Sequence, residues 1–289
     1  MKEYFKLFRL HQWIKNIFIF VPLVFSKNLF NYDLLFIVIA GFFEFCFASS
    51  VVYIINDIID IESDREHPVK RTRPLPSGKI SKKSASISAV IVSVIVLIFL
   101  PFFNLSFDAF LLTYIILNIF YSFKLKNIVI IDIFSIAAGF MIRIISGAAV
   151  INVEISSWLI LTTMFISLFL GVMKRHSELT LVEKKSTRKV LSEYSLTFLD
   201  QMATVAAAGV IICYALYSVA IRTVSVFGTD KLIFTTPFVV FGIFRYMYLV
   251  YMNAQGENTS KILISDLPMI FNILLYILFS ILIIYKIVN

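Results

Sequence analysis

Residues 34–64 read LLFIVIAGFFEFCFASSVVYIINDIIDIESD. The apolar part of this stretch, up to Asn56, is long enough for a membrane-spanning helix, which needs about 20 residues. Asp57, Asp60 and Asp64 follow at spacings of three and four residues. Three aspartates at the mouth of a membrane helix have little structural use. The stretch therefore predicts a helical membrane protein with a site for a divalent cation and a phosphorylated substrate.

The composition of the chain excludes an ordinary soluble protein. It has 289 residues, of which 60% are hydrophobic and 30 are Phe, and its mean hydropathy is +0.91. A soluble domain of this length cannot bury so much apolar surface, because the buried fraction rises only slowly with size. We expect an all-α integral membrane protein, since helices satisfy their own backbone hydrogen bonds in lipid and no segment alternates like a barrel strand.

Nine apolar segments are predicted to span the membrane. The first contains Pro22 and Lys27, and no signal-peptide cleavage site follows it, so it is interpreted as a retained span. No linker or repeat divides the chain, which predicts a single domain over residues 1–289 with long loops at about 57–83 and about 174–202. The predicted spans are approximately 14–31, 34–56, 84–103, 107–123, 128–150, 157–173, 203–223, 233–252 and 267–287.

The basic residues set the orientation of these spans. Most of the 26 Lys and Arg fall in segments on the N-terminal side of the membrane. Positive residues favour the cytoplasmic side, so the N-terminus and both long loops are predicted to be cytoplasmic in the cell (inner or plasma) membrane. The net charge of +8 follows from this topology, and the bases have no aromatic platform between them, which argues against nucleic-acid binding. The exceptions are Lys27, Arg222, Lys231 and Lys286 on the opposite side, and Arg143 and Arg245 within spans.

The acidic run predicts a metal site. Helical residues advance by about 100°, so Asp57, Asp60 and Asp64 fall within about 60° of one another if the helix continues to Asp64. Converging carboxylates repel one another unless a cation joins them, and Mg²⁺ is usually held by one or two carboxylates plus substrate phosphates. Asn56 can orient a phosphate or a carboxylate beside the metal. A solvated acidic helix end is the alternative interpretation.

Basic residues and a rigid turn follow the acids. Arg65, Lys70, Arg71 and Arg73 come before the turn residues 74–78, which read PLPSG. Acid, base and a rigid turn so close together are typical of a site that binds a metal and a polyanion. Lys70 and Arg73 are therefore candidates for substrate binding.

Further motifs accompany this run along the chain. They are His11-Gln12-Trp13-Ile14-Lys15-Asn16, His67-Pro68, Lys70-Arg71-x-Arg73-Pro74-Leu75 with Gly78, Tyr121-Ser122-x-x-Leu125-Lys126 with Asp132, Gly139-Phe140-x-x-Arg143-x-x-x-Gly147-Ala148, Lys174-Arg175-x-x-Glu178, Arg188 and Tyr194. Over roughly residues 9–200 the chain resembles the UbiA superfamily of membrane prenyltransferases, and within it the decaprenyl-phosphate phosphoribosyltransferase group. The resemblance implies a bundle of about nine helices around a central cavity, with Asp57, Asp60 and Asp64 as catalytic, metal-binding residues.

The second long loop lacks a second aspartate-rich motif. Members of the superfamily that prenylate aromatic rings typically carry one there to hold the magnesium of a prenyl diphosphate. This chain has Lys174 and Arg175, with Glu178 one helical turn beyond them. The departure disfavours a prenyl-diphosphate donor and suits a more anionic substrate bound partly by bases. Ordinary cytoplasmic positive charge with a helical ion pair is the alternative interpretation.

Two arginines are predicted to lie within spans. A lone arginine at the bilayer centre costs about 2.5–3.5 kcal/mol, so Arg143 should face the interior with Asp132 or a substrate phosphate as its partner. Purely structural pairing is the alternative. For Arg245 the same question arises, with snorkelling or a lipid-phosphate contact as alternatives.

The resemblance also implies substrate contacts from other cytoplasmic segments. Lys15 and Asn16 would contribute to phosphate binding, although Lys15 with Trp13 could equally anchor the chain at the interface. Tyr121 and Lys126 would close over a phosphoribosyl group, or they form an ordinary charged loop.

The resemblance and the charges together predict an enzyme that uses Mg²⁺ to transfer 5-phosphoribosyl from 5-phosphoribosyl 1-diphosphate to a polyprenyl phosphate. The product would be a precursor of cell-envelope pentose, and a homo-oligomer is compatible with the sequence. One alternative is a UbiA-type prenyltransferase that joins an isoprenoid diphosphate to an aromatic or other acceptor. Another is a transporter, which is disfavoured because transport sites usually lie near the bilayer midplane and these acids lie at its boundary.

Overall fold

A computed structural model describes residues 2–66, 70–182, 189–253 and 265–285. Within these residues all regular structure is helical. Contacts divide the chain into two compact units. Unit 1 comprises residues 1–23, 29–135 and 142–153, and unit 2 comprises residues 24–28, 136–141 and 154–289. The single domain expected from the sequence stays a prediction.

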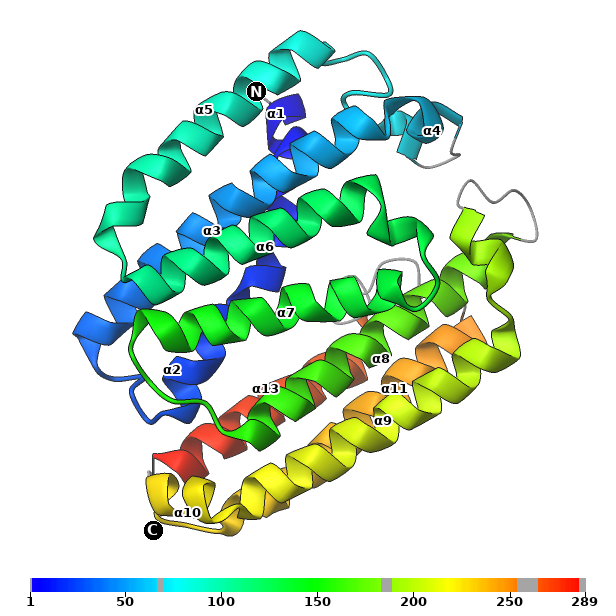
Figure 1. Ribbon diagram of the computed structural model, residues 1–289. Coiled ribbons are helices and arrows are strands. Elements are labelled where there is room, and N and C mark those ends of the chain that lie inside the picture. Colours follow the sequence, from blue (N-terminus) through cyan, green and yellow to red (C-terminus); the bar gives the residue numbers. More distant parts are fainter. Residues whose placement is uncertain (1, 67–69, 183–188, 254–264, 286–289) are drawn as a thin grey trace. The chain divides into compact units, whose positions relative to one another are not determined.

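Unit 1 is built around the long helix α3, Tyr32–Ile59, which carries the acidic run at its end. Helices α5 and α6 pack against α3, as Figure 1 shows. The other helices that lie wholly or mainly in this unit are α1 (Lys2–Leu7), η1 (Leu10–Phe20), α2 (Val21–Phe25, whose end is in unit 2), α4 (Ile61–Glu66), η2 (Lys70–Thr72), α5 (Lys82–Phe99), η3 (Leu100–Phe102), α6 (Leu105–Phe123), η4 (Leu125–Asn127) and α7 (Ile131–Val150, whose middle is assigned to unit 2).

Unit 2 is built from antiparallel neighbours in the sequence, with α8 packed along α9 and α11 along α13 (Figure 1). Tyr214, Tyr217, Phe227, Leu232 and Ile284 form a buried cluster in this unit. Its helices are α8 (Ser157–Val182), η5 (Lys189–Glu193), α9 (Leu196–Val219), α10 (Ile221–Phe227), η6 (Lys231–Thr235), α11 (Thr236–Asn253) and α13 (Leu267–Ile284).

The described residues contain 8 helices long and apolar enough to cross a membrane. They overlap the second to ninth predicted spans, although Leu196–Val219 begins earlier than the predicted 203–223 and Ser157–Thr180 ends later than the predicted 157–173. The first predicted span, 14–31, is replaced by the shorter apolar segment Leu10–Phe25. Its first 11 residues form the 3₁₀ helix η1. Because a 3₁₀ helix rises about 2.0 Å per residue, η1 and α2 together cover about 30 Å, which is the thickness of the hydrocarbon core.

Side-chain caps fix where several helices begin. Asn31 accepts a hydrogen bond from the amide of Leu34 at the start of α3, and Ser81 and Asn104 cap α5 and α6 in the same way. Short polar residues favour these positions because their oxygens satisfy amides that have no partner within the helix. The caps lie just outside the apolar runs, so they set the helix boundaries at the membrane surface.

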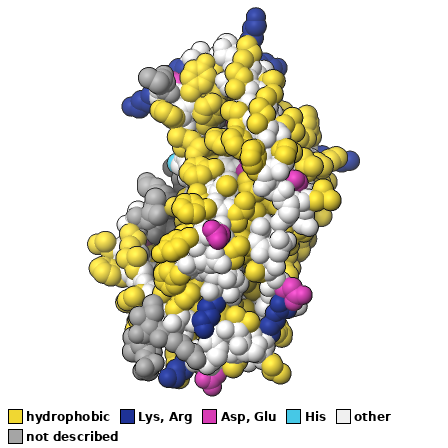
Figure 2. All heavy atoms as spheres, turned by 90° about the vertical axis from the view of Figure 1, so that its left-hand side faces the viewer, with side chains coloured by type: hydrophobic (Ala, Val, Ile, Leu, Met, Phe, Trp, Pro, Cys, Tyr) yellow, Lys and Arg dark blue, Asp and Glu magenta, His cyan; other side chains and the backbone are white. Residues whose placement is uncertain are grey.

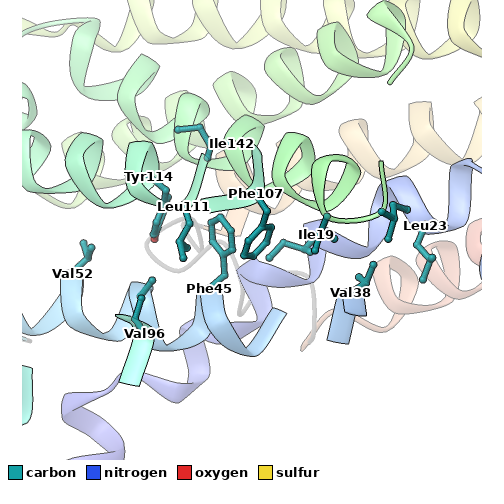
Figure 3. Close-up of a cluster of buried hydrophobic side chains, with 13 residues drawn as sticks. Ile19, Leu23, Val38, Phe45, Val52, Val96, Phe107, Leu111, Tyr114 and Ile142 are labelled. Atoms are coloured by element: carbon teal, nitrogen blue, oxygen red, sulfur yellow. The ribbon is translucent and has the colours of Figure 1, made fainter. Parts of the chain in front are cut away.

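An apolar cluster holds η1, α3 and α6 together in unit 1. Figure 3 shows Phe45 of α3 pointing toward Phe107 of α6, with ring centroids 5.7 Å apart. Tyr114, two turns further along α6 on the same face, also packs on Phe45, with ring centroids 5.4 Å apart. Gly147 of α7 lies against η1 so closely that an added Cβ would stand 2.1 Å from the carbonyl oxygen of Ile19. Only a glycine permits this approach of the two backbones.

The surface of the protein is suited to lipid. Figure 2 shows hydrophobic side chains covering a broad area of the surface, with few charged side chains among them. Large apolar residues such as Leu105, Phe36 and Phe244 are well exposed. A soluble protein rarely exposes so much apolar surface, so these helices are interpreted as membrane-spanning.

Candidate functional site

The acidic run lies where α3 ends and α4 begins. Helix α3 stops at Ile59, and Asp60 is its C-cap with φ −93° and ψ 8°. Helix α4 starts at Ile61, and the amide of Asp64 donates to the carbonyl of Asp60 at 2.8 Å. The helix that would place all three aspartates on one face is therefore interrupted at the middle aspartate. This interruption changes which acids converge.

Asp57 and Asp64 converge on the guanidinium of Arg73. Its Nη1 lies 3.2 Å from Asp57 Oδ1 and 2.6 Å from Asp64 Oδ2. Both aspartates are 2% exposed. Arg9 pairs with Asp57, and Lys70 Nζ lies 3.6 Å from Asp64 Oδ1. We call these five residues the Asp57–Asp64 cluster.

Asp60 points to different partners. Its Oδ1 accepts from Lys126 Nζ at 2.5 Å, and its Oδ2 accepts from the Asn56 amide at 3.2 Å. Asn56 thus orients a carboxylate, one of the two roles expected for it. Within the described ranges, no group of three or more His, Cys, Asp or Glu could hold a metal ion. The expected convergence of all three aspartates is corrected to two, because α3 ends at Ile59.

The two converging carboxylates nevertheless fit a magnesium ion. Arg73 Nη1 already occupies a position where one positive centre contacts an oxygen of each acid. Mg²⁺ prefers hard oxygen ligands and is commonly held by one or two carboxylates with substrate phosphates completing its shell. Asp57 and Asp64 are therefore the residues that could hold it. The repulsion attributed to these acids from the sequence is relieved here by arginine and lysine.

The turn after the acids positions Arg73. The Arg73 amide donates to the carbonyl of Lys70 at 2.9 Å, and Gly78 adopts the left-handed φ of 74° that closes the turn. Leu75 and Ile80 anchor the turn in an apolar cluster with Ile54 of α3. Burial lowers the pKa of the Arg73 guanidinium, which Asp57 and Asp64 partly offset, and arginine remains charged at neutral pH. His67 and Pro68 lie outside the described residues.

Sequence reasoning missed Arg9. Its backbone is left-handed, with φ 51° and ψ 47°, a conformation that costs energy in a residue with a Cβ. Its guanidinium pairs with Asp57 and lies 5.0 Å from the Tyr53 ring centroid. Ser50 and Trp13 fasten this segment to α3, since Ser50 Oγ donates to the carbonyl of Phe8 and accepts from Trp13 Nε1. In the sequence, Arg9 is marked only by its position next to the 11–16 motif. As one of the basic residues before the first span, it contributed to the predicted orientation in the membrane.

Lys15 and Asn16 differ in what they contact. Lys15 is half-buried, and in the described part of the chain its ammonium has no hydrogen-bond or ion-pair partner. Asn16 is fully buried, and its Nδ2 lies 3.2 Å from both Cys46 Sγ and Ser49 Oγ. Asn16 Oδ1 accepts from Arg143 Nε at 2.7 Å. Lys15 therefore suits phosphate binding, whereas Asn16 acts by holding Arg143.

Arg143 faces the interior of unit 1, as predicted, and is 4% exposed. Besides Asn16, it contacts Tyr114, donating to the hydroxyl at 2.8 Å and lying 4.6 Å over the ring. Tyr114 was not singled out from the sequence, because nothing marks one aromatic residue among many. Asp132 is eleven residues away on the same helix, about 16 Å along the axis, so it is too far to pair directly with Arg143.

The remaining predicted residues of unit 1, Tyr121 and Lys126, lie at the end of α6 and just beyond it. Tyr121 is half-buried in the last turn of α6, and Lys126 lies in η4. Lys126 joins the acidic run through Asp60. A residue 66 positions away in the sequence thus reaches the same end of α3.

The predicted residues of the second loop belong to unit 2. Arg175 is fully buried and pairs with Glu178, and Lys174 Nζ lies 3.9 Å from Glu178 Oε1. This is the helical ion pair that the alternative interpretation described, and substrate binding by these residues stays a prediction. Because Arg175 has no exposed surface, the accessible groups are Lys174 and Glu178. Arg188 lies outside the described residues, and Tyr194 is buried and stacks on Phe198.

Arg245 has an internal partner. Its guanidinium donates to both carboxylate oxygens of Asp266, at 3.1 and 2.8 Å. Asp266 is the N-cap of α13, and the Arg245 hydrogen bond holds the pKa of its carboxyl below the usual value. Pairing between α11 and α13 therefore replaces the snorkelling and lipid-phosphate alternatives.

Comparison with known families decides the identity of this fold. The model of the UbiA prenyltransferase family matches residues 17–284, which is nearly the whole chain. The chain belongs to the UbiA prenyltransferase family. It is therefore an enzyme, a multi-pass membrane transferase of that family, and the transporter alternative is wrong.

Two curated relatives in the UbiA family are similar to this chain. The decaprenyl-phosphate phosphoribosyltransferase of Corynebacterium glutamicum is 36% identical over 218 residues, which cover 73% of this chain and 66% of that protein. The protein of the same name from Mycolicibacterium smegmatis is 33% identical over 219 residues, covering 74% and 69%. The chain thus spans about two thirds of the length of these relatives.

Solved structures of the UbiA family share the fold. A UbiA homolog from Archaeoglobus fulgidus bound to GPP and Mg²⁺ has a TM-score of 0.71 at 17% identity, covering 98% of this chain and 99% of that chain. A digeranylgeranylglyceryl phosphate synthase has a TM-score of 0.66 at 21% identity, with 99% of each chain covered. These likenesses establish the all-α UbiA fold that the sequence predicted.

Proposed function

We propose that this protein transfers the 5-phosphoribosyl group of 5-phosphoribosyl 1-diphosphate to a polyprenyl phosphate and releases diphosphate. The reaction would take place on the cytoplasmic side of the cell membrane, require Mg²⁺ and supply a precursor of cell-envelope pentose. The observation that carries the proposal is the Asp57–Asp64 cluster, where two buried carboxylates meet several cations at the end of a membrane helix. The similarity to two named decaprenyl-phosphate phosphoribosyltransferases supports it.

The charge of this region suits a polyanionic donor. In the Asp57–Asp64 cluster, three basic side chains face two carboxylates, and the pair formed by Asp60 and Lys126 is neutral. Lys15 of η1 adds a further cation to this unit. The net charge of these side chains is therefore positive. A donor that carries a 5-phosphate and a diphosphate would neutralise it through charge-assisted hydrogen bonds.

Donor binding would exchange counterions within the cluster. Arg73 is shared between Asp57 and Asp64, and its side chain is 30% exposed, so it can turn toward a bound phosphate without unfolding the loop. Arginine suits this role because its planar fork matches carboxylate and phosphate equally well. Arg9 and Lys70 would likewise exchange their aspartate partners for phosphate oxygens of the donor. The carboxylates so released are the ones that fit the metal.

Magnesium, when bound by Asp57 and Asp64, would neutralise the charge that develops on the departing diphosphate. In the transfer itself, a phosphate oxygen of the lipid acceptor forms a bond to the anomeric carbon as the bond from that carbon to the diphosphate oxygen breaks. The anomeric centre then has oxocarbenium character, as in other glycosyl transfers. The acceptor is already an oxyanion, so no side chain need remove a proton from it.

The role of the protein's bases is then to hold two anionic substrates together against their repulsion. Positioning of this kind accounts for a large part of the rate increase in many transfer reactions. In unit 2, the segment that follows the long helix α8 was expected to lack a second aspartate motif, and α8 there carries Lys174 and Glu178, whose charged groups lie 3.9 Å apart. A lysine there suits a phosphate and does not replace a magnesium ligand. This difference favours phosphoribosyl transfer over prenyl transfer.

A transfer assay tests the proposal. Purified protein in liposomes is given labelled 5-phosphoribosyl 1-diphosphate, polyprenyl phosphate and Mg²⁺, and the label is followed into the organic phase. A parallel reaction contains an isoprenoid diphosphate and an aromatic acceptor. We expect label in the lipid only in the first reaction, and loss of transfer in Asp57→Asn.

The matched control is Glu62→Gln, which neutralises an exposed acid of the same run that pairs only with Arg65 among the residues described. This variant should keep the wild-type rate. Product formed only from the isoprenoid diphosphate would replace the proposal with prenyl transfer. No product from either donor would remove the support for both substrate assignments.

A further inference from the structure

Three helices of unit 2 meet at the carboxylate of Asp200. His176 of α8 places Nε2 3.3 Å from Asp200 Oδ1, at the start of α9. The hydroxyl of Tyr251, near the end of α11, donates to the same oxygen at 2.9 Å. The rings of His176 and Tyr251 also pack edge to face, with centroids 4.8 Å apart. We call His176, Asp200 and Tyr251 the Asp200 latch.

The latch fixes the direction of the imidazole. His176 is 8% exposed, and its Nδ1 is buried without a hydrogen-bond partner within the described residues. Asp200 and the Tyr251 ring are therefore what orients this side chain. Removing Asp200 would leave both ring nitrogens of this buried imidazole without a partner among the described residues, and an unsatisfied buried polar group is costly. The end of α8 consequently depends on Asp200.

His176 immediately follows Lys174 and Arg175 in the same helix. Successive helical residues differ by about 100° in direction, so fixing His176 also fixes where its neighbours point. Those neighbours hold Glu178, because Arg175 pairs with it and Lys174 lies 3.9 Å from it. A rotation of α8 at this level would move all of them together.

We propose that the Asp200 latch is a positioning device that sets the direction of Lys174 and Glu178 for an anionic substrate. The inference rests on the proposed function, since it assigns Lys174 to a phosphate. His176, Asp200 and Tyr251 are positioning residues and touch no reacting atom. Asp200 accepts the contacts of α8 and α11, so it is the residue whose loss releases the latch.

The first test compares two variants of the latch with a neighbour on the same helix. Asp200→Ala should raise the KM for the donor or the acceptor about tenfold and change kcat far less, which corresponds to losing about 1.4 kcal/mol of binding. Asp200→Asn keeps an oxygen acceptor and should stay within about threefold of wild type. Gln201→Ala, at an exposed position of α9, should behave as wild type.

A double-mutant cycle separates positioning from general stability. In a Lys174→Gln background, Asp200→Ala should add less than about a twofold effect, because the two changes act on one contact. An equal loss in both backgrounds would overturn the inference. If Asp200→Ala does not fold, Tyr251→Phe removes a single hydroxyl and takes its place in the cycle.

Binding of inorganic diphosphate to the same proteins, measured by calorimetry, gives a second readout. We expect about tenfold weaker binding in Asp200→Ala, with wild-type binding in Gln201→Ala. Unchanged binding in Asp200→Ala would contradict the latch. If Asp200→Ala weakens diphosphate binding as expected but wild type transfers no phosphoribosyl group, the proposed function fails while the inference about anion positioning stands.

Discussion

Arg73 is the residue on which the charge balance of the Asp57–Asp64 cluster depends. Its Nη1 contacts both buried aspartates, and neither acid has enough exposure to be solvated if this contact is lost. Arg9 also pairs with Asp57, and Lys70 with Asp64, but Arg73 Nη1 contacts an oxygen of each acid. Removing the shared guanidinium would leave buried negative charge poorly paired, which is costly in a protein interior.

Arg73→Gln should therefore lower both stability and transfer. We expect a loss of about 2–3 kcal/mol in unfolding free energy, because a buried ion pair is broken from one side. Thermal unfolding in detergent measures this loss. Arg73→Lys keeps the charge without the fork and should lose less stability. Wild-type stability in Arg73→Gln would show that the two aspartates do not rely on Arg73.

Lys15 and Asn16 are adjacent, but substitution of Lys15 should weaken substrate binding, whereas substitution of Asn16 should lower stability. Lys15→Gln should leave the unfolding midpoint nearly unchanged and raise the KM of a phosphate substrate about tenfold, because the ammonium holds no partner among the described residues. Asn16→Ala should cost about 1–3 kcal/mol of stability, because Arg143, Cys46 and Ser49 each lose a contact. Unfolding midpoints and steady-state kinetics on both variants check this. Equal destabilisation by the two changes would contradict the assignment.

At this scale the sequence identified the acids but not their partners. The spacing of Asp57, Asp60 and Asp64 located the run, and hydropathy placed it at a membrane boundary. The pairing of Asp60 with Lys126 depends on how α6 and η4 return to α3, which no local pattern encodes. The interruption at Asp60 was equally invisible, because residues 56–64 contain no glycine or proline that would mark a helix end.

At the scale of elements, the approach of α7 to η1 depends on one glycine. The backbone of α7 at Gly147 packs directly on the carbonyl of Ile19, with no room for a side chain. This contact joins the helix that carries Arg143 to the segment that carries Asn16. The geometry of the buried polar cluster therefore follows from helix packing.

Gly147→Ala should destabilise the protein by about 2–3 kcal/mol, because the added Cβ would clash with a backbone atom that cannot move alone. Thermal unfolding in detergent measures the effect. Gly242→Ala is the matched control, since its Cβ would meet only the end of the Asn272 side chain, at 3.2 Å. Similar stability of the two variants would contradict the close packing of α7 on η1.

Hydropathy predicted most helices, because each apolar run must satisfy its backbone within lipid. It misjudged the first span for a physical reason. The expected span length of about 20 residues assumes the α-helical rise of about 1.5 Å per residue. η1 is a 3₁₀ helix, which rises about 2.0 Å per residue, so fewer residues cover the same thickness of the membrane. The apolar segment is accordingly shorter than 14–31 and begins earlier, at Leu10.

At the scale of the whole molecule, the UbiA fold and the apolar surface establish a multi-pass membrane protein. Which side each loop faces is a prediction from the distribution of Lys and Arg. The Asp57–Asp64 cluster lies where α3 ends, at the boundary that the charges assign to the N-terminal side. Orientation therefore decides whether the candidate site meets soluble cytoplasmic phosphates.

Cysteine labelling in intact cells tests this orientation. Cys46 and Cys213 are buried, so added cysteines would dominate the signal. Ser77→Cys, in the turn after the acidic run, should resist an impermeant maleimide until the cells are opened. Asp230→Cys, between α10 and η6, should react in intact cells. The reverse pattern would place the acidic run outside and contradict a cytoplasmic site.

Whether Asp57 and Asp64 hold the magnesium ion for phosphoribosyl transfer is decided by the Mg²⁺ dependence of that transfer in wild type, Asp57→Asn and Asp64→Asn, with Glu62→Gln as control. Wild type and Glu62→Gln should move label from 5-phosphoribosyl 1-diphosphate into polyprenyl phosphate with the same Mg²⁺ requirement, and chelation by EDTA should stop both. Each aspartate variant should lose at least about a hundredfold in rate, because the carboxylates that fit the metal have been neutralised. Full-rate transfer by either aspartate variant, or undiminished transfer in EDTA, would contradict the account.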